Sequence, residues 1–188
     1  MEAIIRREII VTRTTCRVFC VTVSVILMSL GAFVRIPLPW TPVPLTLQTF
    51  FVLLSAALLG KGLGVSSQLA YLFLGVMGVP IFSGAGSGML YLLGPTGGYL
   101  VGFVAATLFL STTLGRAKEK AWMVWLLFLG ADVLILSMGT AWLKISAGVS
   151  IRLAMAMGFV PFVVGDFIKV GASVYLYHKL RRRVESIL

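Results

Sequence analysis

Residues 154–178 read AMAMGFVPFVVGDFIKVGASVYLYH, an apolar stretch that is long enough to cross a membrane and is interrupted by Asp166 and Lys169. A membrane-spanning helix needs about 20 mostly apolar residues. A charged side chain near the centre of such a helix costs roughly 2.5–3.5 kcal/mol, so an acid and a base are kept there only if they pair or bind something. The stretch therefore predicts a transmembrane helix that contains a functional site.

The composition of the whole chain is typical of a protein built inside a membrane. Of its 188 residues, 59% are hydrophobic and 12% are charged, and the mean hydropathy is +1.04. Soluble domains have about 25% charged residues. Backbone amides in lipid must find their partners within the segment, so we expect an all-α fold, a polytopic membrane protein. Residues 1–188 are expected to form one transmembrane domain, with no room for a soluble one.

Turn-forming residues divide the chain into six apolar runs, which predict six transmembrane helices. Their approximate ranges are 17–35, 45–60, 63–79, 95–111, 121–143 and 154–178. Prolines within 37–44 exclude a helix there, so we expect this segment to be extended, with Pro44 as the first residue of the second helix. Gly60-Lys61-Gly62 predicts a tight turn between the second and third helices. The glycine-rich segment 83–88 predicts a flexible outer cover or a re-entrant turn.

Basic residues flank the apolar runs and give the chain a formal net charge of +10. The two terminal tails and the turns after the second and fourth runs contain about twelve of them, against about three in the alternate connections. Because basic residues are enriched in cytoplasmic loops, both termini are expected to face the cytoplasm. The outer connections are then 36–44, 80–98 and 144–152, and two of them are long enough to fold over a pocket. We therefore expect these basic residues to contact membrane lipid and not nucleic acid.

Asp166 and Lys169 are three residues apart, which places their Cβ atoms about 5–6 Å from each other on one helical face. One interpretation is an ion pair that neutralises itself against a neighbouring helix. The other is that the carboxylate and the ammonium are presented to one polar group of a ligand. Phe162 lies on the same face and would add an apolar wall. With cytoplasmic termini, both charges fall in the outer half of the helix or near its middle, within reach of a ligand from outside.

Other polar residues in the apolar runs have two possible roles each. Gln48 needs a hydrogen-bond partner in lipid, either on a neighbouring helix, worth roughly 0.6 kcal/mol, or on a substrate at the outer mouth of the bundle. Gln68 allows the same two roles. The segment 94–98 either directs the N–H groups of a helix start towards a ligand carboxylate or lets two helices approach closely through small residues. Asp132, alone in the fifth run, has no evident partner.

Aromatic side chains near the outer connections are candidates for the walls of a pocket. Phe82, Tyr91 and Trp142 could line an apolar cavity, although aromatic residues at membrane edges are more often interfacial anchors. Ser83 begins the glycine-rich loop beside them. No strand precedes that loop and the sequence contains no Walker pattern, so the chain is not expected to hydrolyse ATP itself.

Catalysis is not expected from this sequence. Cys16, Cys20 and the single His178 cannot supply a metal quartet or a disulfide framework. An intramembrane enzyme would need a cluster of acids with metal or a Ser–His or Asp–Asp pair, but Asp132 and Asp166 belong to different predicted helices. We therefore expect no catalytic residue, no bound metal and no cofactor.

Five groups of residues follow one another along almost the whole chain. They are Gly31-Ala32 with Ile36-Pro37-Leu38-Pro39, then Val43-Pro44-Leu45-Thr46-Leu47-Gln48-Thr49, then Gly78-Val79-Pro80-Ile81-Phe82, then Gly94-Pro95-Thr96-Gly97-Gly98-Tyr99, and finally Pro161-Phe162 before Gly165-Asp166 and Lys169. Each is weak alone. In this order they make the chain resemble the biotin-specific substrate-binding subunits (BioY) of energy-coupling factor transporters.

The resemblance implies a six-helix S-component in the bacterial plasma membrane. Such a subunit captures biotin from outside and delivers it to the cytoplasm when docked on a transmembrane T-component and two ATPase subunits, which supply the energy. Its outer loops close over the ligand. The substrate-binding residues expected here are Asp166, Lys169, Gln48, Phe82, Ser83, Tyr91, Phe162 and Trp142.

Alternatives remain for the ligand contacts and for the function. In the first alternative, Asp166 accepts a ureido N–H and Lys169 donates to the ureido oxygen. In the second, Lys169 pairs with the valerate carboxylate. A self-sufficient secondary carrier for biotin and an S-component for another vitamin are the alternative functions. The face expected to contact the T-component departs from the family pattern, because Val25 and Ser29 stand where alanines four residues apart are common.

Overall fold

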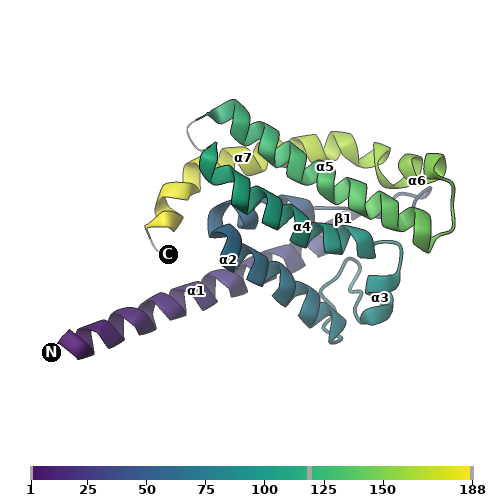
Figure 1. Cartoon of the computed structure of the whole chain (residues 1–188). Coiled ribbons are helices and arrows are strands. Elements are labelled where there is room, and N and C mark those ends of the chain that lie inside the picture. The colour runs from purple at the N-terminus through teal and green to yellow at the C-terminus, as the bar shows by residue number, and fades with distance from the viewer. Residues whose placement is uncertain (1, 118–119, 187–188) are drawn as a thin grey trace.

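Long helices arranged as a bundle make up almost all of the structure, a computed structural model (Figure 1). It describes the backbone of residues 2–117 and 120–186, and the side chains of residues 13–117, 120–184 and 186. The elements in chain order are α1 (Glu2–Phe33), β1 (Arg35–Ile36), β2 (Leu45–Thr46), α2 (Gln48–Val76), α3 (Met89–Leu93), α4 (Gly97–Thr113), η1 (Leu114–Arg116), α5 (Ala121–Ser146), α6 (Ile151–Gly158), η2 (Val160–Phe162) and α7 (Val163–Glu185). The predicted all-α fold class is confirmed.

The element α2 is a hairpin of two helical arms that turns at Gly60. This residue has φ 69° and ψ −170°, a conformation essentially restricted to glycine. Hydrogen bonds join the arms in antiparallel order: Gln48 Nε2 donates to the Tyr71 hydroxyl (2.7 Å), and Gln68 Nε2 donates to Ser55 Oγ (3.1 Å). Within the described part of the chain, five helical segments are long and apolar enough to cross a membrane when α2 is counted once. The turn makes two helices of α2, in agreement with the six that the sequence predicts.

The segment between α1 and α2 is extended up to the start of α2. β1 and β2 form a two-residue antiparallel ladder in which Ile36 faces Leu45. The expectation that Pro44 begins the second helix is therefore wrong, because α2 begins at Gln48. The physical reason is tertiary pairing: the backbone that follows Pro44 bonds to β1, and this pairing outweighs the tendency of proline to start a helix.

A break divides the sixth apolar run, where one helix over residues 154–178 was expected. α6 ends at Gly158, the short η2 contains Pro161, and α7 begins at Val163. Proline has no backbone N–H and clashes with the preceding turn, so a helix cannot pass through it undisturbed. As a result, Asp166 lies in the first turn of α7 and not in the middle of a longer helix.

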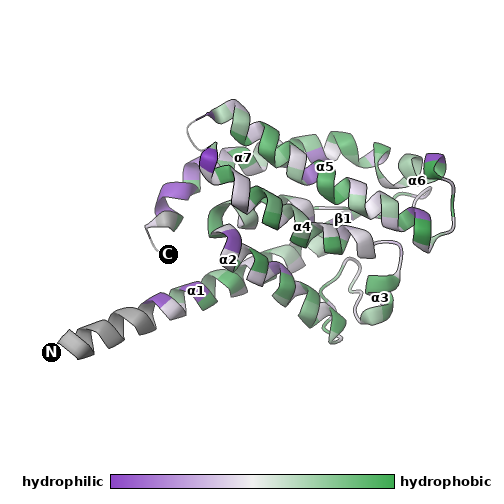
Figure 2. Ribbon diagram, in the orientation of Figure 1, coloured by the Kyte–Doolittle hydropathy of each residue, from purple (hydrophilic) through white to green (hydrophobic). Residues whose placement is uncertain are grey.

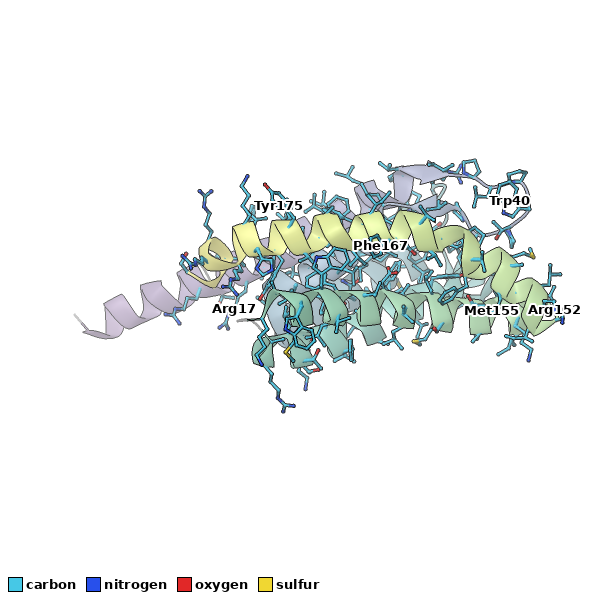
Figure 3. The ribbon with its side chains drawn as sticks, turned by 90° about the horizontal axis from the view of Figure 1, so that it is seen from above. Arg17, Trp40, Arg152, Met155, Phe167 and Tyr175 are labelled. Carbon is cyan, nitrogen blue, oxygen red and sulfur yellow. The ribbon has the colours of Figure 1, made fainter. Side chains whose placement is uncertain are left out.

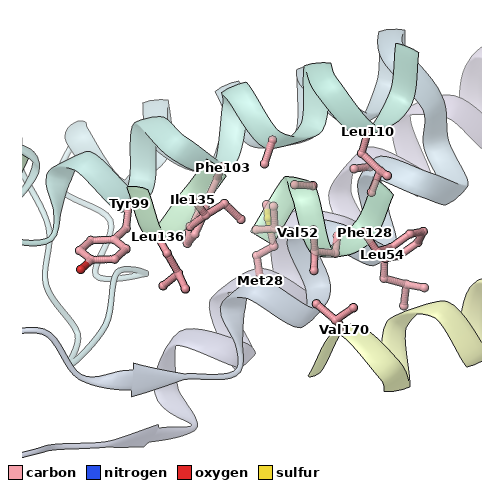
Figure 4. Packing of buried hydrophobic residues seen from close by; sticks show 14 of the residues in the cluster. Met28, Val52, Leu54, Tyr99, Phe103, Leu110, Phe128, Ile135, Leu136 and Val170 are labelled. Atoms are coloured by element: carbon pink, nitrogen blue, oxygen red, sulfur yellow. The ribbon is translucent and has the colours of Figure 1, made fainter. Parts of the chain in front are cut away.

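Apolar side chains from the long helices meet in a continuous core. Met28 of α1, Val52 of α2, Phe128 of α5 and Val170 of α7 are fully buried (Figure 4). Gly139 of α5 leaves room for the ring of a tyrosine from α4, which would clash with any larger residue at that position. Hydrophobic residues cover most of the helices, and hydrophilic ones gather in the last turns of α7 (Figure 2).

The bundle has two ends of different character. α1 begins and α7 ends at the same end, where α4 also leads into η1 (Figure 1). Arg17 lies towards this end, and Trp40 and Arg152 lie at the opposite one (Figure 3). We call the first the basic end, because it contains Arg17, Lys61, Arg116 and the arginines of the last turns of α7, and the second the loop end.

Candidate ligand-binding site

A pocket lies towards the loop end, between the β2–α2 segment, the loop before α4, and helices α4, α5 and α7. It contains about 500 Å³ of space that protein atoms do not fill, part of which is open to solvent. Its lining residues are Val43, Pro44, Thr46, Gln48, Thr49, Ser83, Tyr91, Thr96, Tyr99, Leu100, Phe103, Leu136, Phe162, Asp166 and Lys169.

The short arms of α2 explain why a pocket forms at this end. The first arm, residues 48–59, extends only about 18 Å at 1.5 Å per residue, whereas the hydrocarbon core of a bilayer is about 30 Å thick. The segments 34–47 and 77–96, which are irregular apart from the short β1, β2 and α3, complete the bundle at the loop end. Irregular backbone at this depth is stable only where it is buried in protein or lines a cavity. The irregular backbone of these segments is therefore found at the same end of the bundle as the cavity.

Asp166 and Lys169 form an ion pair on the wall of this pocket. Only 1% of Asp166 and 9% of Lys169 is exposed. Lys169 Nζ also donates to the Thr46 carbonyl oxygen (3.0 Å) and to Thr49 Oγ1 (2.6 Å). An ammonium has three N–H donors, so these three acceptors satisfy it completely. The two charges are thus paired with each other, and they also face the cavity.

Asp166 has capacity left to bind a ligand. Among the described residues, its Oδ2 atom is buried and accepts no hydrogen bond. It lies in the first turn of α7, on the wall of the pocket. A buried carboxylate oxygen without a donor is costly, and a ligand N–H would satisfy it.

Gln48 takes part in a structural network and lines the pocket as well. Its amide nitrogen donates to the Tyr71 hydroxyl, which in turn donates to the Ile81 carbonyl oxygen (2.8 Å). Its amide oxygen accepts from Thr46 Oγ1 (3.2 Å). Gln68, by contrast, bonds to Ser55 across the α2 hairpin and is not among the lining residues. The interhelical role therefore applies to both glutamines, and only Gln48 also faces the cavity.

The loop that follows α2 contributes Ser83 and Tyr91 to the lining. The Tyr91 hydroxyl donates to the Ser83 carbonyl oxygen (3.1 Å), and the ring of Tyr91 stacks on Phe82 with centroids 5.1 Å apart. Phe82 itself is fully buried behind this layer, over Gly75 of α2, and does not line the pocket. Phe82 therefore supports the Tyr91 ring from behind.

Trp142 is also outside the lining, at the corner where the chain enters α4. Its indole Nε1 donates to the Gly94 carbonyl oxygen (2.9 Å), and its side chain packs directly on Gly98. The small residues at the start of α4 thus permit close helix packing, one of the two roles considered for segment 94–98. Thr96, just before α4, is the residue of this segment that faces the pocket.

Four lining residues come from α4 and α5 and were not predicted. Tyr99, Leu100 and Phe103 follow Thr96 at helical spacings of three, four and seven residues, which is a periodic face that the sequence does contain. Tyr99 and Leu136 lie on neighbouring helices in Figure 4. The Tyr99 hydroxyl donates to the Gly158 carbonyl oxygen (2.6 Å), which orients its ring. Leu136 has no such pattern, because its position follows only from the packing of α5 on α4.

Asp132 of α5 is the second buried acid of the bundle. It is 2% exposed and lies one helical turn from Leu136, yet it is not in the lining. Within the described part of the chain, its Oδ1 atom is buried and has no hydrogen-bond partner. The described structure therefore shows no partner for this oxygen either.

Fold and site together define a multi-pass helical membrane protein with a pocket inside the bundle and one acid–base pair in the pocket wall. Transport proteins that bind their substrates within the bundle belong to this class. The BioY family model matches residues 6–186. The chain belongs to the BioY family, which confirms the resemblance found in its motifs.

Curated relatives and a solved structure agree with this assignment. The chain is 38% identical over 161 residues to a probable biotin transporter BioY of Pyrococcus horikoshii, with 86% of this chain and 93% of the relative covered. It is 38% identical over 156 residues to the biotin transporter BioY of Thermotoga maritima, with 83% and 90% covered. A crystal structure of the S-component for biotin from an ECF-type ABC transporter has the same fold, with a TM-score of 0.83, 24% identity and 93% of each chain covered. The relatives are named as transporters, in agreement with the expectation that this protein is not an enzyme.

Proposed function

We propose that this protein captures biotin from outside the cell and delivers it to the cytoplasm together with an ATP-driven coupling module. The observation that supports the proposal best is the Asp166–Lys169 pair in the wall of a pocket whose other walls are mostly apolar. Biotin has the matching chemistry, with a polar ureido group at one end, an apolar ring and chain, and a carboxylate at the other end. The names of the relatives point to the same ligand.

The ureido group is placed against Asp166 in this proposal. Asp166 Oδ2 accepts a ureido N–H, and Lys169 holds the carboxylate in position. For Lys169 to donate to the ureido oxygen, its ammonium must release one of its two threonine contacts, because all three of its donors are in use. The carboxylate of biotin lies at the far end of the molecule, so one ligand pose cannot bring both ends to these adjacent residues.

Arg35 is the partner that we assign to the valerate carboxylate. A second hollow shares Pro44, Ser83, Tyr91 and Thr96 with the pocket and extends it to Arg35. A ligand whose ureido group is bound at α7 would direct its acid chain into this hollow. A guanidinium is well suited to bind a carboxylate through two parallel hydrogen bonds.

We propose the orientation in the membrane from the charge distribution, and the partner subunits from the family. We place the basic end on the cytoplasmic side of a bacterial plasma membrane, because basic residues are enriched there. The pocket then opens towards the outside, beneath segments 34–47 and 77–96. A transmembrane T-component and two ATPase subunits are the partners that would supply energy, and their docking would involve the helix faces of the bundle.

Titration of the purified protein with biotin, followed by tryptophan fluorescence, tests the ligand and the role of Asp166. Asp166→Asn should weaken binding about tenfold to a hundredfold, since a hydrogen bond to a charged group contributes about 1.5–3 kcal/mol. Asp132→Asn is the matched control: it changes the other buried acid, which does not line the pocket, and should have a much smaller effect. Absence of biotin binding by the unmodified protein at micromolar concentration would reject the ligand, and titration with thiamin or riboflavin would then identify an S-component for another vitamin.

Uptake by proteoliposomes distinguishes the two transport functions. The protein reconstituted alone should bind biotin without accumulating it, and uptake should require the coupling module and ATP. Accumulation by the protein alone, driven by an ion gradient, would instead show a secondary carrier.

A further inference from the structure

A third hollow, separate from the pocket and from the hollow beside Arg35, lies at the basic end, between α1, the first arm of α2 and the last turns of α7. It contains about 600 Å³ of unfilled space and shares no lining residue with the ligand-binding pocket. Its lining, which we call the groove, consists of Phe19, Cys20, Val23, Ser24, Leu27, Phe51, Leu54, Ser55, Leu58, Leu59 and Val184. All but Cys20 and two serines are hydrocarbon side chains, so the groove suits an apolar chain.

Cations mark the end of the groove that faces the membrane surface. Counted from Arg13, the residues Arg17, Cys20, Ser24 and Leu27 follow after four, seven, eleven and fourteen positions. This helical spacing places all five on one face of α1. Both arginines are exposed.

Two further cations come from the other walls. Lys61 follows Leu59 directly after the Gly60 turn, and Arg183 precedes Val184 at the end of α7, and both basic side chains are exposed. Figure 3 shows Arg17 at the end of the bundle where α7 ends. Exposed basic residues on α1, α2 and α7 therefore lie close in sequence to residues that line the groove.

Ser24 places inside the groove a hydroxyl group that lacks a hydrogen-bond partner among the described residues. It is only 6% exposed, and within the described part of the chain its Oγ atom has no hydrogen-bond partner. A buried hydroxyl without a partner costs about 1–3 kcal/mol, so an occupant with an acceptor at this depth would be stabilised. Ser24 is seven residues, or about 10 Å of helix, from Arg17. That length fits the span from an ester carbonyl, past a phosphate, to the cation that binds the phosphate.

We propose that the groove is a binding site for one anionic phospholipid. An acyl chain fills the groove, an ester carbonyl accepts a hydrogen bond from Ser24 Oγ, and the phosphate and headgroup lie among Arg17, Lys61 and Arg183. Burial of the chain supplies affinity, and the cations select a negative headgroup, each contributing about fivefold near a membrane surface.

Native mass spectrometry of protein released from nanodiscs with equal amounts of phosphatidylglycerol and phosphatidylcholine tests this site. The unmodified protein should retain one phosphatidylglycerol in preference to phosphatidylcholine. Arg17→Gln should lower that preference about fivefold, whereas Arg116→Gln, which removes an exposed cation of the same end outside the groove, should not. Ser24→Phe fills the groove and should abolish retention of either lipid. All three variants should still bind biotin, which would show that they are folded, because none of the three positions lines the pocket.

Three results would overturn the proposal. Equal retention of the two lipids would remove the selectivity for negative headgroups. Equal losses in Arg17→Gln and Arg116→Gln would show a general effect of surface charge instead of a site. Retention of no lipid, combined with a cross-link from Cys20 to a T-component in the assembled transporter, would show that the groove receives a helix of that partner.

Discussion

Lys169 connects two structural elements through one ammonium group. It pairs with Asp166 on its own helix and donates to Thr46 and Thr49 at the start of α2. Removing one partner of such a buried pair leaves an uncompensated charge, which is far more costly than the pair itself is stabilising. We therefore expect these residues to matter for folding as well as for the proposed ligand binding, and substitutions at Asp166 must be checked for both.

Arg35 allows a cleaner test, because its side chain is exposed and is not among the hydrogen-bond or ion-pair partners of Lys169. Arg35→Gln should weaken the binding of biotin about tenfold, since a charge-assisted contact to the carboxylate is lost. The binding of biotin amide should stay unchanged, so the two ligands should become nearly equal in affinity. Calorimetric titration of both ligands measures this ratio.

Arg152→Gln is the control for Arg35, because it removes an exposed cation of the same end outside the hollow. It should leave both affinities unchanged. Equal losses for biotin and its amide in Arg35→Gln would assign Arg35 a structural role in β1.

The sequence predicted the site best where the energetic cost of a residue was highest. Asp166 and Lys169 stand out because charges in a spanning segment require a partner. Tyr99 was missed although the face that it shares with Thr96 was visible in the spacing. Leu136 could not be found, because an apolar residue in an apolar helix has no distinguishing feature until its neighbours are known.

At the scale of elements, the α2 hairpin determines how deep the pocket is. Its two arms are too short to fill the bundle, so irregular segments close the loop end. The turn was predictable from Gly60-Lys61-Gly62, a local pattern. The strand pairing after Pro44 was not, because β1 and β2 are joined only in the tertiary structure. The break at Pro161 follows from a local rule that the apolar composition of the run concealed.

Gly60→Ala tests the hairpin. Gly60 has open space around it, so the substitution adds no clash and acts only through its φ of 69° and ψ of −170°. We expect the free energy of unfolding to fall by about 1–3 kcal/mol, the cost of a side chain in such a conformation. Thermal unfolding in detergent measures the change.

Gly62→Ala is the matched control within the same turn. Gly62 also has open space, but its φ lies outside the left-handed region, so alanine should leave the protein equally stable or slightly more stable. If both variants lose the same stability, the effect comes from the turn's surface and not from the backbone conformation of Gly60.

At the scale of the whole molecule, the two ends of the bundle differ in character. The candidate ligand-binding pocket and the irregular segments belong to the loop end, whereas the cations and the groove belong to the basic end (Figures 1 and 3). An alternation of basic and non-basic connections was readable from the sequence, because it depends on charge counts alone.

Labelling of intact cells with a membrane-impermeant maleimide tests the proposed orientation. In a protein whose Cys16 and Cys20 are replaced by alanine, Ala147→Cys at the loop end should react, and Gly115→Cys at the basic end should react only after permeabilisation. Both positions are exposed, so a difference reports the side of the membrane. The opposite pattern would invert the topology.

The bond from Lys169 to the Thr46 carbonyl oxygen links the charge pair to the backbone that covers the pocket. Thr46 belongs to β2, which is paired to β1, so this short ladder and the ammonium group form one mechanical unit. Movement of the covering segment away from α7 would break that bond. If biotin binds as proposed, the ammonium group that takes part in recognition would therefore also slow the release of the ligand.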